Sequence, residues 1–347
     1  MSTVLVSGAT GFIAQHIIHQ LLQKGYEVIG TVRNEEKASR LLSLFQDDRL
    51  SLEVVASLSD PGAFDHIFIK HGDRIKYVIH TASPCHYSST DYEADMLIPA
   101  INGTKSLLDS IKRHGSASVE HVVYTSSFAA VSNVASAYDE KLVLNEESWN
   151  NDTWEAAKEN AKTAYYGSKA LAEKAAWEFL QQNRDSVRFG LTTVNPCYVF
   201  GPQLFDESIS NTLNASCQNI NEIVLSDTGD EVDQTFASLF IDVRDVAKAH
   251  LLAIEVPALT GKRLLLANTK FAMQDIVDTI NKQFPALNGR IAVGVPGNGA
   301  EVVKHIATLD NSQSKKLLGF RFKGLEETVY DTVSQILRAK DAQVRKD

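Results

Sequence analysis

The chain has 347 residues, of which 44% are hydrophobic and 22% charged, a balance typical of globular rather than disordered or fibrous proteins. Length alone suggests about two domains. The formal net charge of −9 argues against nucleic acid as a partner, because phosphate binding needs a concentrated basic face.

Cysteine use and hydropathy narrow the protein class further. Cys85, Cys197 and Cys217 form no CxxC pair, so a disulfide framework or a thiolate zinc site is not expected, and neither is any other metal. We expect no secretory segment before the first apolar run, Val4–Val6, and no membrane span, which needs about 18 consecutive apolar residues. The expected location is the cytoplasm.

Up to about Asn195, short β-rich runs alternate with helical stretches, which is typical of a parallel sheet with crossover helices. The expected strands are Val4–Ser7, Glu27–Val32, Ser51–Val55, Lys76–Thr81, Glu120–Thr125 and Arg188–Val194. The expected helices are Ile13–Lys24, Glu35–Phe45, Pro61–His71, Tyr92–Arg113 and Thr163–Gln182. Beyond Pro202 helices predominate, at Ser208–Asn219, Val243–Glu255, Met273–Phe284, Ser312–Leu318 and Leu325–Lys340.

The first expected strand runs through a glycine turn into a helix. Gly8 permits a tight turn, Gly11 lets the backbone approach a pyrophosphate, and Ala14 allows close packing of helix on strand. A pair of glycines alone is a weak signal. Its position after the first strand, at a helix N-terminus that favours anions, predicts a dinucleotide site.

The end of the second strand distinguishes NADPH from NADH. Arg33 lies where a 2′-phosphate would be bound, and Lys37 follows one helical turn later. Glu35 or Glu36 could instead accept from the ribose, although acids after the N-cap residue Asn34 are explained by the helix dipole. We therefore expect NADPH.

The alternation of strands and helices, with the glycine turn after the first strand, predicts a doubly wound Rossmann α/β fold. Residues 1–200 are expected to form the NADP-binding domain. Residues 201–347 are expected to form mainly a smaller, largely helical substrate lobe, with some segments returning to the first domain. No linker separates the two parts, so we expect them to pack as one unit.

A tyrosine and a lysine four residues apart indicate catalysis of carbonyl reduction. The spacing puts Tyr165 and Lys169 on one helix face, where the ammonium favours the phenolate. Ser127 follows a buried strand at the carboxyl edge of the sheet, where it can hold a carbonyl oxygen. The alternative for Tyr165 and Lys169 is a surface ion pair or a packed aromatic on an amphipathic helix.

Six short motifs then occur in the order that one enzyme family shows. They are Gly8-x-x-Gly11-x-x-Ala14, His80-Thr81-Ala82-Ser83-Pro84, Asn102-Gly103-Thr104, Thr125-Ser126-Ser127, Tyr165-x-x-x-Lys169 and Asn195-Pro196. With them the chain resembles the extended short-chain dehydrogenases/reductases. Within that group it is similar, nearly end to end, to the yeast methylglyoxal and isovaleraldehyde reductases of the dihydroflavonol reductase-like subfamily.

The resemblance implies roles for particular residues. It assigns catalysis to Ser127, Tyr165 and Lys169. The expected cofactor-binding residues are Gly8, Thr10, Gly11, Phe12, Ile13, Arg33, Lys37, Ser57, Leu58, Ala82, Ser83, Tyr165, Lys169, Pro196, Val199 and Ser216. The expected substrate-binding residues are Pro84, Phe128, Val131 and Tyr198. At Ser57 many relatives carry an acid, which weakens the case for an adenine contact there.

Other polar constellations are expected to be structural. His16 and His19 are interpreted as helix-surface residues, and His80 as a satisfied, partly buried histidine. Asp242, Arg244 and Asp245 are expected to cap a helix and form an internal ion pair. Arg263 is likewise interpreted as structural, and Cys197 as a small apolar filler.

The function expected is NADPH-dependent reduction of small to medium aldehydes, ketones and α-dicarbonyls to alcohols. A catalytically silent NADP-binding regulator and a nucleotide-sugar epimerase are the alternatives on the same fold. The segments around the expected nicotinamide site carry few charges, although Lys162 could approach from the helix start before Tyr165. The oligomeric state is left open.

Overall fold

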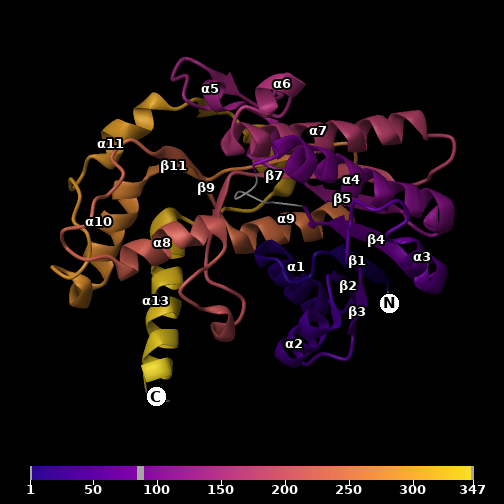
Figure 1. The fold of residues 1–347 in the computed structure, drawn as a ribbon, viewed down its shortest axis with the longest axis horizontal. Helices are drawn as coiled ribbons and strands as arrows, with labels where there is room; N and C mark the ends of the chain where they lie inside the picture. The colour runs from indigo at the N-terminus through magenta and orange to yellow at the C-terminus, as the bar shows by residue number, and fades with distance from the viewer. Residues whose placement is uncertain (1, 84–89, 345–347) are drawn as a thin grey trace.

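A computed structural model describes residues 2–83 and 90–344. Its centre is a seven-stranded parallel sheet of order β10-β7-β5-β4-β1-β2-β3 (Figure 1). The strands are β1 Thr3–Ser7, β2 Glu27–Val32, β3 Leu50–Val54, β4 Ile75–His80, β5 His121–Thr125, β7 Gly190–Pro196 and β10 Arg263–Leu266. The expected doubly wound α/β class is confirmed, and β10 adds a strand that the sequence pattern did not show.

Helices cover both faces of this sheet, as two buried clusters show (Figure 1). On one face lie α1 Phe12–Gln23, α2 Glu35–Phe45 and α9 Val243–Glu255. On the other lie α3 Asp65–His71, α4 Ile98–Ser110 and α7 Ala161–Gln182. Strands buried on both faces explain the nearly continuous apolar runs in their sequences.

The C-terminal part contributes a second, three-stranded sheet of order β11-β9-β8. Its strands are β8 Tyr198–Phe200, β9 Ala237–Asp242 and β11 Thr269–Ala272, with β9 parallel to β8 and antiparallel to β11. Its core contains the fully buried rings of Phe200, Phe240 and Phe271. The helices α8 Ala215–Leu225, α10 Met273–Gln283 and α13 Leu325–Val344 surround them (Figure 1).

Short elements complete the fold. They are α5 Val134–Ala137, α6 Trp154–Ala157, α11 Gly299–Val302, α12 Ser312–Leu318 and the two-stranded sheet of β6 Val143–Leu144 with β12 Thr308–Leu309. Within residues 2–83 and 90–344, no helix has the length and apolarity that crossing a membrane requires.

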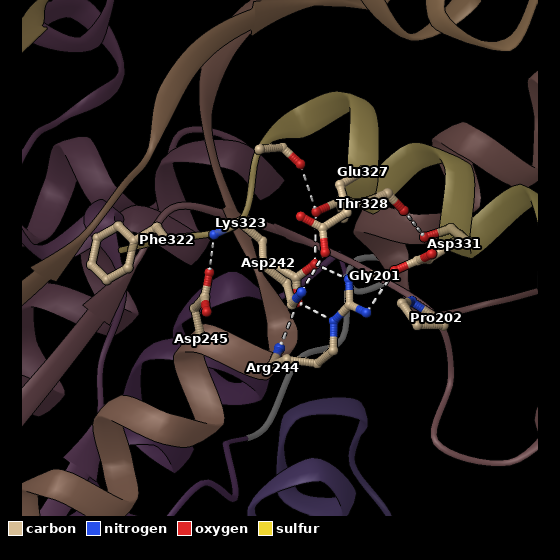
Figure 2. Close-up of polar contacts among 12 residues, drawn as sticks. Gly201, Pro202, Asp242, Arg244, Asp245, Phe322, Lys323, Glu327, Thr328 and Asp331 are labelled. Carbon is tan, nitrogen blue, oxygen red and sulfur yellow. Dashed lines mark hydrogen bonds and ion pairs between the residues drawn. The ribbon is translucent and has the colours of Figure 1, made fainter. Parts of the chain in front are cut away.

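A cluster of polar contacts connects α13, the last helix, to the start of α9 (Figure 2). Asp242 is fully buried, caps α9 by accepting from the Arg244 N–H at 2.8 Å, and accepts from Thr328 Oγ1 of α13 at 2.6 Å. The Arg244 guanidinium reaches Asp242 at 2.7 Å and Asp331 of α13 at 2.6 Å. The expected cap and internal ion pair are confirmed.

Several expected boundaries were wrong for local reasons. The helix expected over Pro61–His71 begins only at Asp65, because Gly62 has φ of +75°. The helix expected over Ser208–Asn219 begins at Ala215, after a turn in which Ser210 Oγ donates to the Thr212 carbonyl.

The prediction that His16 lies on the helix surface was also wrong. This residue is 5% exposed, and its Nε2 lies 3.0 Å from the Pro202 carbonyl oxygen.

Candidate active site

A cavity of about 1000 Å³ extends along the carboxyl edge of the parallel sheet toward the second sheet. Open α/β sheets bind ligands at this edge. Ser127, Tyr165 and Lys169 all line the cavity. So do these expected cofactor residues: Gly8, Thr10, Gly11, Phe12, Ile13, Arg33, Lys37, Leu58, Ala82, Ser83, Pro196, Val199 and Ser216.

The turn between β1 and α1 requires glycine. Gly8 has φ of +71°, and a Cβ there would lie 3.0 Å from the Ala82 Cα atom. Gly11 occupies the N-cap position of α1, where it places no side chain in front of the helix N-terminus. The backbone is therefore open to a ligand at the positive end of the helix dipole.

The segment after β4 is held against this turn by Ser7. Its Oγ accepts from the N–H groups of Thr81 and Ala82, each at 3.1 Å, and lies 2.6 Å from His80 Nδ1. His80 is 2% exposed; burial and, secondarily, the charge of Lys169 lower its pKa to about 3. A neutral imidazole bonded to Ser7 is structural and forms no triad with Ser127.

The end of β2 presents cations to the cavity. Arg33 and Lys37 line it, whereas Glu35 and Glu36 in the first turn of α2 do not. Asn34 caps α2 by accepting from the Lys37 N–H at 3.0 Å, as the sequence predicted. This arrangement suits a phosphate group better than a pair of ribose hydroxyls.

The expected catalytic side chains meet between β5 and α7. Asn160 and Thr163 cap α7 reciprocally, which fixes where the helix begins. Tyr165 Oη lies 3.4 Å from Ser127 Oγ, and Lys169, one turn further along, is 8% exposed. Ser127 Oγ also accepts from the Ala129 N–H at 3.1 Å, which fixes its orientation.

A buried polar network supports Ser127 from behind. Asn195 Nδ2 donates to the Ser127 carbonyl at 3.2 Å and to Glu173 Oε2 at 2.6 Å. Arg263 Nε donates to Glu173 Oε1 at 2.6 Å, and Ser126 Oγ also donates to this carboxylate. The expected structural role of Arg263 is confirmed, but Glu173 gave no sequence signal because a single helical glutamate resembles any surface acid.

Three expected ligand residues are not placed at the cavity. Pro84 lies outside the described residues. Val131 is fully buried, because the 3₁₀ turn Phe128–Ala130 directs it into an apolar cluster. Ser57 donates to Asp60 Oδ1 at 2.9 Å beside the cavity, while its neighbour Leu58 lines the wall.

Sequence reasoning missed much of the wall beyond Tyr165. Phe128 and Tyr198 line it as expected, and Lys162 reaches it from the start of α7, as the sequence allowed. The wall also contains residues that the sequence did not indicate: Ala137, Tyr138, Tyr166, Asn214, Asn219, Phe236, Leu239, Ile306 and Ala307. Tyr166 adjoins the motif tyrosine, which is a usable signal. The others come together only through tertiary folding.

Comparison with known proteins agrees with this geometry. Residues 4–266 match the model of the NAD dependent epimerase/dehydratase family. The NADPH-dependent methylglyoxal reductase of Saccharomyces cerevisiae is 52% identical over 97% of this chain and 98% of its own length. A putative NADPH-dependent methylglyoxal reductase of Candida albicans is 41% identical over 97% and 98%.

A solved structure matches nearly the whole fold. The crystal structure of yeast methylglyoxal/isovaleraldehyde reductase complexed with NADPH superposes with a TM-score of 0.95 at 52% identity, covering 98% of this chain and 99% of the other. The chain therefore belongs to the NAD dependent epimerase/dehydratase family. Its Rossmann domain and Tyr-Lys motif are those of an extended short-chain dehydrogenase/reductase.

Proposed function

We propose that this protein is an NADPH-dependent carbonyl reductase that converts small to medium aldehydes, ketones and α-dicarbonyls, such as isovaleraldehyde and methylglyoxal, to alcohols. One observation carries the proposal: Tyr165 Oη lies 3.4 Å from Ser127 Oγ, with Lys169 one turn away, in a cavity that begins at the glycine turn. The names of the relatives, methylglyoxal and isovaleraldehyde reductases, support the same activity.

The residues at the other end of the cavity fit NADPH. Gly8 leaves a cradle that a Cβ atom would fill, and Gly11 leaves the N-terminus of α1 open to a pyrophosphate. Arg33 and Lys37 would hold the 2′-phosphate. NADPH, when bound, supplies the hydride.

The chain's own residues handle the carbonyl oxygen and its proton. The hydroxyls of Ser127 and Tyr165 converge on one point, where they can donate hydrogen bonds to that oxygen. As hydride reaches the carbonyl carbon, Tyr165 Oη gives its proton to the oxygen, and an alcohol forms. The Lys169 ammonium favours the resulting phenolate. Without such a cation, the ordinary pKa of a tyrosine hydroxyl, near 10, would oppose the transfer.

We also propose how the chain divides into domains and in which compartment the protein acts. Residues 1–200 form the NADP-binding domain, and residues 201–347 mainly the substrate lobe. The cytoplasm is the proposed compartment, since Cys197 and Cys217 are free thiols, as is usual in a reducing environment.

A carbonyl panel tests the proposed function. Purified protein should oxidise NADPH when isovaleraldehyde or methylglyoxal is added, and mass spectrometry should find the corresponding alcohols. Tight NADPH binding without turnover would instead favour the silent regulator. Turnover confined to nucleotide sugars would favour the epimerase.

A further inference from the structure

The charged side chains in the cavity wall are all cationic. They are Arg33, Lys37, Lys162 and Lys169. Among the residues that the structure describes, no aspartate or glutamate lines this cavity, although the whole chain has a net charge of −9. A cavity with cations only attracts anions. Arg33 and Lys37 are matched by a cofactor phosphate and Lys169 by Tyr165, so Lys162 has no assigned role.

Lys162 lies at the substrate end of the cavity. It is in the first turn of α7, three residues before Tyr165, and this spacing puts both side chains on one helix face. The two residues are separated by about 4.5 Å of helix rise. The Lys162 ammonium lies 5.0 Å from the ring centroid of Tyr138, which also lines the cavity and is 40% exposed.

No carboxylate of the described chain neutralises this ammonium as an ion pair. The acid that acts electrostatically on neighbouring Tyr138 is Asp233. Its carboxylate is engaged within its own loop, where Oδ1 accepts from Thr235 Oγ1 at 2.7 Å and from the Phe236 N–H at 3.1 Å. Asp233 does not line the cavity, so a ligand anion in the cavity could approach the Lys162 ammonium more closely than this acid does.

We propose that Lys162 binds a carboxylate of the substrate, so that the preferred carbonyl compounds include oxo acids with a few carbon atoms between the two groups. The proposal rests on the reductase function proposed above and names a substrate class for the same cavity. A single flexible ammonium suits a carboxylate, whereas the phosphate site has two cations. Phe128, Tyr198 and Phe236 also line the cavity, and their rings suit an apolar linker between the two groups.

A matched pair of substrates isolates the charge. Levulinate and its methyl ester share the same ketone and differ in the anion. The wild type should have a kcat/KM about 1.5-fold to fivefold higher for levulinate, the range expected of an ion pair with the exposed Lys162 side chain. This preference should fall as salt is added, because screening weakens exposed charge pairs.

Variants assign the preference to one side chain. Lys162→Met should bring the acid-to-ester ratio to one or below, and Lys162→Arg should keep it above one. Lys141→Met is the matched control: Lys141 is exposed, lies three residues from Tyr138 and does not line the cavity. It removes the same charge from the surface and should leave the ratio unchanged.

Each contrary result has a distinct meaning. Three results would overturn the proposal for Lys162: a wild-type acid-to-ester ratio of one or less, an unchanged ratio in Lys162→Met, or an equal decrease of the ratio in Lys141→Met. In each case turnover of isovaleraldehyde would still support the reductase function. Failure of the wild type to reduce isovaleraldehyde, levulinate and the ester with NADPH would overturn the reductase function and this proposal with it.

Discussion

The guanidinium of Arg263 donates to Glu173 Oε1 at 2.6 Å in a pair whose side chains are 9% and 0% exposed. Glu173 also accepts from Asn195, which in turn donates to the Ser127 carbonyl. The pair therefore connects strand β10 of the sheet, through α7, to the backbone at the proposed catalytic serine.

Removing one partner of this pair should be costly. Arg263→Met should lower the free energy of unfolding by about 3–5 kcal/mol, because it leaves the buried Glu173 charge uncompensated. Lys24→Met is the control, since Lys24 and Glu255 form an exposed pair that contributes about 0–1 kcal/mol. Urea unfolding measures both. Equal losses of unfolding free energy in the two variants would show that the buried pair contributes no more to stability than the exposed pair.

Cofactor choice should depend on Arg33. Arg33→Ala should reduce the preference for NADPH over NADH, measured as the ratio of kcat/KM values, by about ten- to a hundredfold, the value of hydrogen bonds to a charged group. Arg49→Ala, which removes an exposed arginine paired with Asp47 outside the cavity, should not change the ratio. An unchanged ratio in Arg33→Ala would show that the phosphate binds elsewhere.

Acid should destabilise the fold before most of the carboxylates titrate. Burial lowers the pKa of four histidines, to about 3 for His80 and to about 4 for His16, His121 and His250. Unfolding returns each to an ordinary pKa of 6.5, so the unfolded chain binds more protons and stability falls as the pH drops from about 6.5 toward 4.

One acid opposes this trend. Burial raises the pKa of Asp245 to about 6, so that its contribution to stability falls as the pH rises toward 6. Four histidines outweigh it. Unfolding free energies measured from about pH 7 to pH 5 should therefore decrease, and His250→Asn should make the decrease shallower whatever its effect on absolute stability. A flat profile in the wild type would contradict the buried, neutral state of these histidines.

The cofactor-binding and catalytic parts of the site were predictable because they depend on local sequence patterns. A glycine turn after β1, a cation after β2 and a tyrosine four residues before a lysine each specify their own geometry, and all three line the cavity. Strands that are buried on both faces are likewise recognisable in the sequence as apolar runs.

The far wall was not predictable, because its residues meet only through tertiary packing. β8 and β10 have three and four residues, too few to show a period, and β10 joins the central sheet from a distant part of the chain. Val131 illustrates the limit: its apolar character fits a binding wall and a core equally well, and a 3₁₀ turn decides for the core.

The most direct test of the proposed proton transfer is the turnover of isovaleraldehyde by Tyr165→Phe, measured together with the affinity of this variant for NADPH. The substitution removes the proton donor 3.4 Å from Ser127 and keeps the ring. We expect NADPH affinity within about threefold of wild type, and kcat lower by about 10²–10⁴-fold, the contribution of a positioned general acid. Near-normal turnover with intact NADPH binding would contradict the proposed proton transfer.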